Sequence, residues 1–501
     1  MRRSILPVLP PLLPLFGAVA ALALGRGRRR QAVLALTVHA ALLGAIAGIL
    51  AHLGTDARPL AHPLGGWDAR TLVGQRVTVH VGIVLVADPL SALVGAVVLV
   101  VFCAAFGWIF LEEETVPLPR VIALSFLLEM GVLGALFTGD AFDFYVFFEL
   151  MGLSAYALVG YRRSPAHVES SLKFAALSLV GSTLMLMGIG AIYGQTGRLA
   201  FASLRDASEA VGSPPLYLFS VGLVLAALCL KAAIVPLHFW LPDAHSIAPT
   251  AISVMLSGAV VKVGAYGVLR FLGSQSSWVW AEVRPVLLAA GAATALYCAL
   301  VAVAQRDLKR LLAWSTASQM GYIVAAAALG TAAGVAAALV HVAAHAAMKA
   351  ALFLCAGAAM VLADHERHWD RMGGLLARSP VLAAATLVSL LSLAGIPPLA
   401  GFVGKLALFD ALLRDGAWIA LTSLLLASAA MVYLAVRVWL GIFGGKQRSP
   451  GRVALATALA GIVVALGLAA GPLVGAARRA ADDLLAGDAY RAAVLGEGGG
   501  R

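Results

Sequence analysis

The stretch LVLAALCLKAAIVPLHFW (residues 223–240) combines a membrane-length apolar run with two residues that such a run normally excludes. Its apolar residues are typical of a helix that crosses about 30 Å of hydrocarbon. Lys231 lies inside the run, where a charged side chain costs roughly 2.5–3.5 kcal/mol on insertion scales. Pro236 follows shortly after and interrupts the helical hydrogen bonds. The stretch therefore predicts a broken membrane helix with a functional lysine beside the break.

Three further ionisable residues interrupt apolar runs in the same way. They are Glu149 in FDFYVFFELMGLSAY (142–156), Lys262 in AISVMLSGAVVKVGAYGVL (251–269) and Lys405 in GIPPLAGFVGKLALF (395–409). Such residues usually face a watery interior and move ions, because burying an isolated charge for packing alone is costly. We call Glu149, Lys231, Lys262 and Lys405 the charged relay, and we expect them to translocate protons through a helix bundle.

Composition excludes a soluble globular domain. Of 501 residues, 61% are hydrophobic and 12% are charged, whereas soluble proteins contain about 25% charged residues. The net charge of +11 comes from arginines in short loops, which indicates membrane topology rather than nucleic-acid binding. The four cysteines are single residues in apolar segments, so we expect no cysteine metal site and no cofactor in the chain.

Apolar windows predict an all-α polytopic membrane protein with about 14 transmembrane helices. The spans lie near residues 4–25, 32–53, 81–110, 120–138, 142–160, 170–194, 214–240, 248–272, 281–304, 310–330, 332–362, 380–412, 416–443 and 452–473. Basic loops follow odd-numbered spans, so the positive-inside rule places those loops in the cytoplasm and both termini outside the cell inner (plasma) membrane. The first span runs directly into GRGRRR (25–30) and a second apolar run, which favours a span over a cleaved secretory signal.

Spans seven and twelve are expected to be broken. Pro236, Pro242 and Pro249 lie within and after the seventh, and the Pro397–Pro398 pair lies inside the twelfth. Membranes tolerate such breaks only inside protein or beside water. The two spans are five apart, so a unit repeated after five spans would be inverted in the membrane. Paired interrupted helices in corresponding halves indicate a transport site.

Several blocks of sequence together resemble a known family. They are ADPLSALVG (87–95), TGDAFDFYVFFELMGLSAYALVGY (138–161), KAAIVPLHFWLPDAH (231–245), APTAISVMLSGAVVKVGAYGVLR (248–270), QRDLKRLLAWSTASQMGYI (305–323), HAAMKAALFLCAG (345–357) and GIPPLAGFVGKLALF (395–409). Over roughly residues 85–440 the chain resembles the antiporter-like membrane subunits of Mrp-type cation/proton antiporters, respiratory complex I and membrane-bound hydrogenases. TGDAFDFYVFFEL and Lys405 look most like the D-type subunit of the Mrp antiporters.

The resemblance implies an organisation and a set of roles. It implies N-terminal spans at 1–119, two inverted five-helix repeats at 120–272 and 281–443, and a last span with a short tail at 452–501. It also implies Glu149 as partner, Lys231 as switch, Lys262 as central relay and Lys405 as distal terminal site. At an effective dielectric constant of about 20, a charge pair 4 Å apart is worth about 4 kcal/mol, which is enough to switch protonation.

Histidines extend the predicted path. His341, His345 and Lys349 are spaced i, i+4 and i+8, which places them on one helix face. A proton relay, a plain hydrogen-bonded pair and a metal site all fit this spacing, but with no third ligand in view metal is the weakest of the three. We expect no metal.

Four other polar residues are candidate parts of the proton path. His238 resembles a family residue at the span-seven break and is a candidate relay. Asp243 and His245 are a candidate entrance near the membrane edge. Lys173 either extends to the interface or joins the network around Glu149.

Three functions fit these observations. The first is a proton-translocating subunit of a multisubunit cation/proton antiporter that exchanges protons for Na⁺, with the lipid bilayer and other membrane subunits as partners. The second is a pumping subunit of a complex I-like NADH:quinone oxidoreductase or a membrane-bound hydrogenase. The third is a scaffold that conducts nothing. No nucleotide loop or nucleophile–base pattern supports catalysis by this chain.

Overall fold

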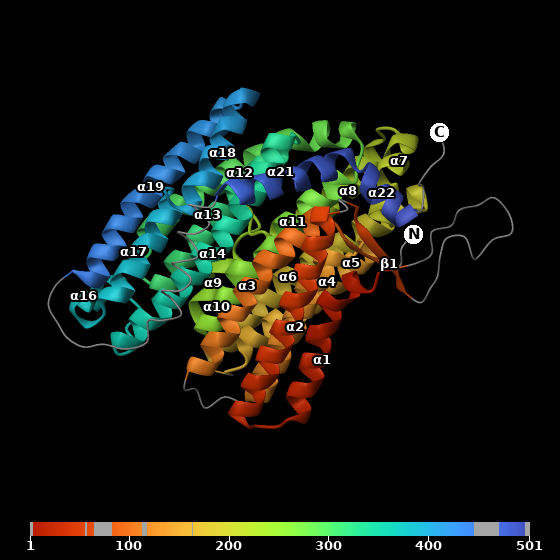
Figure 1. The fold of residues 1–501 in the computed structure, drawn as a ribbon. Helices are drawn as coiled ribbons and strands as arrows, with labels where there is room; N and C mark the ends of the chain where they lie inside the picture. The colour runs from red at the N-terminus through yellow and green to blue at the C-terminus, as the bar shows by residue number, and fades with distance from the viewer. Residues whose placement is uncertain are drawn as a thin grey trace.

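The computed structural model describes residues 4–55, 58–64, 83–112, 118–162, 164–444 and 470–495. Within these ranges, ten helices are long and apolar enough to cross a membrane. The helices nearest the N-terminus lie at one end of an elongated bundle, and those of residues 380–443 lie at the other (Figure 1). The predicted helical polytopic fold is confirmed. The count of about 14 spans stays a prediction, because the span near 452–473 lies almost wholly outside the described residues.

The described elements follow one another along the chain with the labels of Figure 1. They are η1 (Leu6–Val8), α1 (Leu9–Ala23), α2 (Arg28–Thr55), β1 (Leu60–Pro63), β2 (Val84–Ala87), α3 (Pro89–Leu111), α4 (Leu118–Phe137), α5 (Ala141–Gly160), α6 (Pro165–Thr196), α7 (Phe201–Val211), α8 (Pro215–Lys231), α9 (Trp240–Ile247), α10 (Thr250–Met255), η3 (Leu256–Val260), α11 (Val261–Gly273), α12 (Ser277–Ala304), α13 (Leu308–Ala328), α14 (Ala332–Leu362), α15 (Trp369–Met372), α16 (Leu375–Arg378), α17 (Pro380–Ala394), α18 (Ala400–Asp415), α19 (Trp418–Phe443), α21 (Ala470–Ala486) and α22 (Asp488–Leu495).

The predicted span near 81–110 is wrong at its start, because Val84–Ala87 forms a strand. β2 pairs antiparallel with β1, so that Leu60 lies opposite Ala87. Asp88 then begins α3 as its N-cap and accepts a hydrogen bond from the backbone N–H of Ser91 at 2.9 Å. The N-cap side chain satisfies a backbone donor that the first turn leaves unpaired. The chain therefore changes from sheet to helix at this residue.

The seventh predicted span is broken, as the sequence indicates. α8 ends at Lys231 and α9 begins at Trp240, with a cis peptide bond at Val235–Pro236. Two side chains bond to backbone groups that the break leaves free. Thr294 Oγ1 accepts from the N–H of Val235 at 2.9 Å, and the indole N–H of Trp240 donates to Leu230 O at 2.7 Å. The irregular backbone is thus satisfied inside protein, as a membrane environment requires.

The twelfth predicted span is broken in a similar way. α17 ends at Ala394 and α18 begins at Ala400, with a cis peptide bond at Pro397–Pro398. Ser392 Oγ accepts from the N–H of Gly401 at 3.1 Å. A Cβ at Gly401 would lie 1.8 Å from Ser392 O, so only glycine fits where the two half-helices meet.

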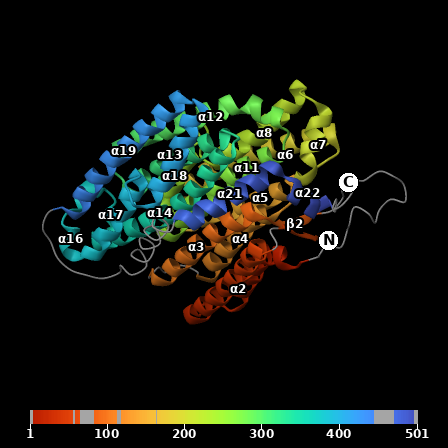
Figure 2. The same ribbon diagram turned by 45° about the horizontal axis from the view of Figure 1, so that its top comes forward.

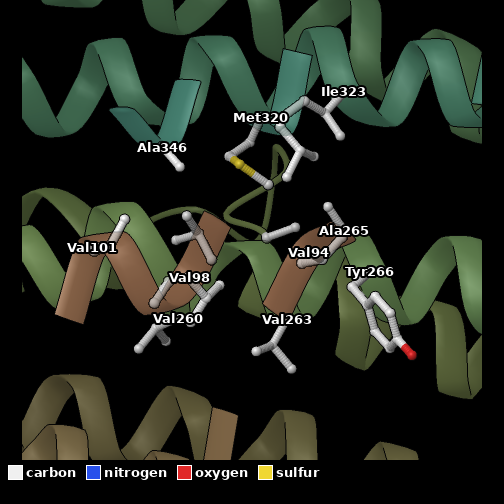
Figure 3. Packing of buried hydrophobic residues seen from close by; sticks show 14 of the residues in the cluster. Val94, Val98, Val101, Val260, Val263, Ala265, Tyr266, Met320, Ile323 and Ala346 are labelled. Atoms are coloured by element: carbon white, nitrogen blue, oxygen red, sulfur yellow. The ribbon is translucent and has the colours of Figure 1, made fainter. Parts of the chain in front are cut away.

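α10, η3 and α11 form one continuous, fully buried central helix. Valines of α3 pack against it, including Val98 and Val101, and Met320 of α13 and Ala346 of α14 lie nearby (Figure 3). A Cβ at Gly258 would lie 2.5 Å from Val101 Cγ1, so this glycine allows α3 to approach closely. The central helix is π-helical over η3, and such turns are frequent at functional sites.

The C-terminal helices lie across the bundle (Figure 2). α21 packs against α14 and α3, and α22 packs against α7. The guanidinium of Arg205 donates to Ala486 O at 2.7 Å and to Leu485 O at 2.8 Å. Since η1 and α22 both contact β1, the first and last described segments lie on the same face of the protein.

Candidate functional site

The three lysines of the charged relay are buried, on three different helices. Lys231 ends α8, Lys262 lies in α11 and Lys405 lies in α18. Lys231 and Lys262 have no exposed surface, and Lys405 is 2% exposed. Glu149 differs, since it is only half-buried on α5. The bundle therefore encloses the amines that the sequence singled out and leaves the carboxylate nearer its surface.

Lys262 lies at the centre of a polar cluster. Its Nζ is 2.8 Å from Nδ1 of His345 and also donates to Ser257 O. Ser257 belongs to the π-helical segment η3, whose wider hydrogen-bonding pattern changes which donors its carbonyls meet. His345 Nε2 has no hydrogen-bonding partner among the described residues. The lysine and the histidine can thus pass one proton between them.

His341 and His345 continue the cluster along α14. Their rings are nearly parallel, with centroids 6.3 Å apart, which agrees with the predicted shared helix face. His341 Nε2 lies 3.0 Å from Oε1 of Gln319 on α13. The ring of His341 also lies 5.7 Å from that of Tyr322. Gln319 was not predicted from the sequence, because a glutamine carries no charge that would distinguish it from other polar residues of a span.

Lys349 occupies the next position on this face of α14. Its Nζ donates to Leu312 O at 2.9 Å and to Ser315 Oγ at 2.5 Å, both on α13. The side chain is fully buried. The spacing i, i+4, i+8 therefore brings two histidines and a lysine into one interior seam, where they face α13 and α11.

Lys405 binds the end of the preceding half-helix. Its Nζ donates to Leu393 O at 2.9 Å, to Ala394 O at 3.0 Å and to Ser428 Oγ at 3.0 Å. The last carbonyls of a helix lack internal partners and carry partial negative charge, so an ammonium group is stabilised there. The same Nζ lies 5.1 Å from the ring of Tyr322, which connects Lys405 to the ring of His341.

Lys231 has different surroundings. Its Nζ has no hydrogen-bonding partner in the described part of the chain. It lies 4.5 Å from the ring centroid of Phe148 and 5.7 Å from that of Phe174. Glu149 instead accepts a hydrogen bond from Ser182 of α6, and no ion pair joins it to Lys231 among the described residues. The structure thus shows the proposed partners apart.

The other predicted relay histidine lies at the first break. The ring of His238 is buried, with the ring of Trp314 at 5.1 Å and that of Tyr297 at 5.6 Å. Aromatic walls of this kind fix the orientation of the imidazole. No hydrogen bond joins His238 to Lys231 among the described residues, so a relay role for His238 stays a prediction.

The predicted entrance residues lie in different environments. Asp243 is partly exposed and forms an ion pair with Arg310 at 3.5 Å, whereas His245 is fully buried with its ring stacked on Phe353 at 4.8 Å. The loop after α14 lies beside α9, because Arg367 donates to Ser246 O. In this loop, hydrogen bonds from the backbone N–H and ring of His368 lower the pKa of Glu366 to about 2. The entrance role of Asp243 and His245 stays a prediction.

Lys173 is not brought to Glu149. It is exposed and forms an ion pair with Glu169, one turn earlier on α6, at 2.6 Å. This geometry matches the alternative in which Lys173 extends to the membrane interface. It leaves Lys173 outside the buried cluster.

One buried carboxyl and one buried ion pair were not predicted from the sequence. Glu129 lies in the apolar run LSFLLEMGVLG (124–134) and is fully buried, so the criterion that identified Glu149 could have found it. The second is the bidentate pair of Arg270 with Asp88, at 2.7 Å for both bonds. Its partners are 182 residues apart, and no local pattern could have joined them. Among the described residues no group of three metal-binding side chains occurs.

Comparisons with known proteins agree on one family. The family described as "NADH:quinone oxidoreductase/Mrp antiporter, TM" matches residues 138–431, more than half of the chain. NADH-quinone oxidoreductase subunit N of Desulforudis audaxviator is 33% identical, over 86% of this chain and 85% of that protein. The D subunit of the Na⁺/H⁺ antiporter of Alkalihalophilus pseudofirmus is 31% identical, over 87% and 88%.

A solved structure agrees with these sequence matches. A chain in the Mrp complex of Dietzia sp. superposes with a TM-score of 0.88 at 29% identity, covering 98% of this chain and 99% of that one. The fold, the arrangement of buried amines and the sequence matches have a common explanation. The chain is a multi-pass membrane protein that belongs to the NADH:quinone oxidoreductase/Mrp antiporter transmembrane family.

Proposed function

We propose that this chain is a proton-translocating membrane subunit of a multisubunit cation/proton antiporter. The observation that carries the proposal is a row of buried titratable side chains that lie close to one another inside the bundle, which we call the track. From Lys262 it passes to His345 and His341, and then by the ring of Tyr322 to Lys405. A buried titratable chain of this kind is the usual marker of an ion pathway in a membrane protein.

The first break supplies the switch in this proposal. Glu149 and Lys231 are apart, and Phe148, the residue before Glu149 in sequence, lies beside the lysine in space. A change in the side chain of Glu149 would bring its carboxylate toward the ammonium group and hold the proton there. When Glu149 returns to Ser182, the lysine loses that stabilisation and can pass its proton toward Lys262.

The helix α11 connects the first break to the second half of the track, which supplies the exit for the proton in this proposal. Gly264 of α11 lies against Ala232, next to Lys231, at a distance where a Cβ would be 2.5 Å from the backbone nitrogen. α11 therefore runs closely past the first break before its lysine meets α14. We propose that the matched breaks belong to inverted repeats at 120–272 and 281–443, with Lys405 as the distal terminal site. Gln319 and Ser428 are polar side chains that support this part of the track.

The orientation and the partners are part of the same proposal. Basic residues follow the odd-numbered spans, which favours cytoplasmic loops there and external termini in a plasma membrane. A relative named as the D subunit of a Na⁺/H⁺ antiporter and a neighbour in an Mrp complex favour assembly with other membrane subunits and Na⁺ as the exchanged cation.

Inverted membrane vesicles from cells that express the complete assembly test the function. A pH-sensitive dye reports proton movement after a Na⁺ pulse. Lys231→Ala should lose most of the Na⁺-dependent signal, while Lys173→Ala, which removes an exposed lysine from a neighbouring helix, should keep it. Full coupled flux in the Lys231→Ala variant, at wild-type protein levels, would favour the scaffold alternative.

A second candidate function rests on the 33% identical relative named NADH-quinone oxidoreductase subunit N. In that case the same relay would pump protons while the redox chemistry occurs on other subunits. Purification from native membranes distinguishes the two. Copurified redox subunits and NADH-driven or hydrogen-driven flux would support the second, and Na⁺-driven flux without them would support the first.

A further inference from the structure

Glu129 is a buried carboxyl that the relay does not use. It lies on α4 with no exposed surface, and neither of its oxygens has a hydrogen-bonding partner among the described residues. His39 of α2 faces it, with Nε2 at 3.5 Å from Oε1. Intramembrane ionisable residues are rare and usually functional, and they usually have a partner. Here the partner is an imidazole.

The hydrogen bonds of His39 define where a proton can lie. Its Nδ1 is 2.8 Å from Ala35 O, and a carbonyl oxygen can only accept, so Nδ1 carries hydrogen. In the neutral ring Nε2 is then an acceptor, and it faces an oxygen of Glu129. A carboxylate and an unprotonated ring nitrogen would set two lone pairs against each other. One proton between Oε1 and Nε2 removes that repulsion.

The surroundings isolate this proton. The ring of His39 meets Phe106 at 4.6 Å and Phe126 at 5.9 Å. α1 and β2, which also contact α4, contain no titratable residue. The thiol of Cys103 on α3 lies within electrostatic range of the Glu129 carboxyl. The other titratable or charged groups on α2, α5 and α11, which pack against α4, are Arg28, Arg29, Arg30, His52, Asp143, Tyr145, Glu149, Tyr156, Lys262, Tyr266 and Arg270. No hydrogen bond or ion pair joins any of these groups to Glu129 in the described residues.

We propose that Glu129 and His39 form a second proton-binding site, which holds one exchangeable proton between α2 and α4 and lies outside the charged relay. Transfer within the site breaks the O–H bond of the carboxyl and forms an N–H bond on Nε2, so the pair changes from two neutral groups to a carboxylate and an imidazolium, with a net charge of zero in both states. The proton enters and leaves the site on the side of His39, because the side chain of His39 is 7% exposed while that of Glu129 is 0% exposed.

Infrared difference spectroscopy on the full chain in lipid, titrated with pH in H₂O and in D₂O, tests this site. We expect an absorption band of a protonated carboxyl that shifts on exchange into D₂O. The band should be absent in Glu129→Gln and displaced in His39→Phe, a change that keeps an aromatic ring among Phe106 and Phe126. The matched control is Glu149→Gln, which removes a different intramembrane carboxyl and should leave the band in place.

The outcomes separate this inference from the proposed function. Identical spectra for the wild type and Glu129→Gln would overturn the site, whatever the flux. A band that neither D₂O nor pH changes would also overturn it, because the carboxyl would then be a fixed packing group. If Glu129→Gln fails to accumulate, His39→Phe and His39→Gln carry the test alone. Loss of flux in Glu149→Gln with an intact Glu129 band would support both the relay and the separate site.

Discussion

The two broken helices each hold a buried lysine beside the break, yet the two ammonium groups have opposite surroundings. Lys405 donates to three oxygens within 3.0 Å. Lys231 has no acceptor in the described part of the chain and lies against the ring of Phe148. The second break supplies oxygens for its ammonium group, whereas the first supplies none among the described residues, and in our proposal the carboxylate of Glu149 takes that place.

The direction of side chains along a helix explains this difference. Every Cα–Cβ bond tilts toward the N-terminus of its helix. Lys405 belongs to the half-helix after the break, so its side chain points back to the break and reaches the carbonyls of Leu393 and Ala394. Lys231 is the last residue of the half-helix before the break, so its side chain points away from the free carbonyls. Similar sequence patterns thus build one site with fixed acceptors and one without acceptors among the described residues.

The largest expected effect comes from Lys231→Met, which removes the charge and keeps the volume. Because no acceptor loses its donor, the free energy of unfolding should change by less than about 1 kcal/mol. Na⁺-dependent proton flux should fall about tenfold or more, which corresponds to at least about 1.4 kcal/mol on the limiting barrier. Flux in vesicles and thermal unfolding in detergent measure the two quantities. A loss of stability with normal flux would contradict this prediction, because Lys231 would then stabilise the fold and not carry protons.

The matched change Lys405→Met should reduce both the free energy of unfolding and the Na⁺-dependent proton flux. The variant leaves the carbonyl of Leu393 without its side-chain donor, and a buried unsatisfied polar group costs about 1–3 kcal/mol. We expect a lower unfolding temperature than for Lys231→Met, together with reduced flux. Equal stabilities for the two variants would mean that the three oxygens contribute nothing net to the second break.

Ser182→Ala changes the switch without touching a charge. Ser182 donates a hydrogen bond to Glu149, and such a hydrogen bond is worth about 1 kcal/mol net. In our proposal this bond keeps Glu149 away from Lys231. Without it, the carboxylate spends more time near the ammonium group, which then releases its proton only at higher pH. The pH of half-maximal flux should rise by about half a unit to one unit. Thr183→Ala is the control, because its hydroxyl bonds to the carbonyl of Leu179 on its own helix. An unchanged pH profile in Ser182→Ala would remove Ser182 from the switch.

The sequence predicted the broken helices well, because proline acts through local backbone chemistry at Pro236 and at Pro397–Pro398. It also predicted the buried lysines, since a charge in an apolar run is visible without a structure. It could not predict what the lysines touch. Ser428 and Ser182 come from other helices and look like ordinary polar residues of a span. The electrostatic difference between the breaks therefore depends on tertiary contacts, which the sequence alone does not show.

Two misses have different causes. The strand at Val84–Ala87 was missed because a short apolar strand and the start of an apolar helix look alike in sequence. Glu129 was missed although it met the criterion used for Glu149, and its partner His39 lies far away in the sequence. The first error reflects real ambiguity in the pattern. The second does not.

The smallest expected effect on proton flux comes from a change at Asp483 in the C-terminal helices. It serves as a reference for the changes at both breaks. Burial, with the carboxylate of Asp88 adding to it and Arg270 opposing it, raises the pKa of Asp483 to about 7 from an ordinary value of 3.8. The docked state of α21 therefore binds the proton more tightly than the undocked state does. Proton binding by Asp483 therefore stabilises the packing of α21 on the bundle. This stabilisation is complete below pH 3.8, declines as pH rises and is lost once pH passes about 7.

Hydrogen exchange of residues 470–495 at pH 6 and pH 8, corrected for intrinsic rates, measures this dependence. Wild-type protection should decrease between the two values, whereas Asp483→Asn, which stays neutral, should hold its protection at pH 8. Proton flux should remain within about twofold of wild type, because Asp483 lies on α21 and outside both broken helices. A variant with the wild-type pH dependence would exclude Asp483 as its cause. A large loss of flux would instead mean that the C-terminal helices control the track, and the contrast between the two breaks would no longer be sufficient to explain proton movement.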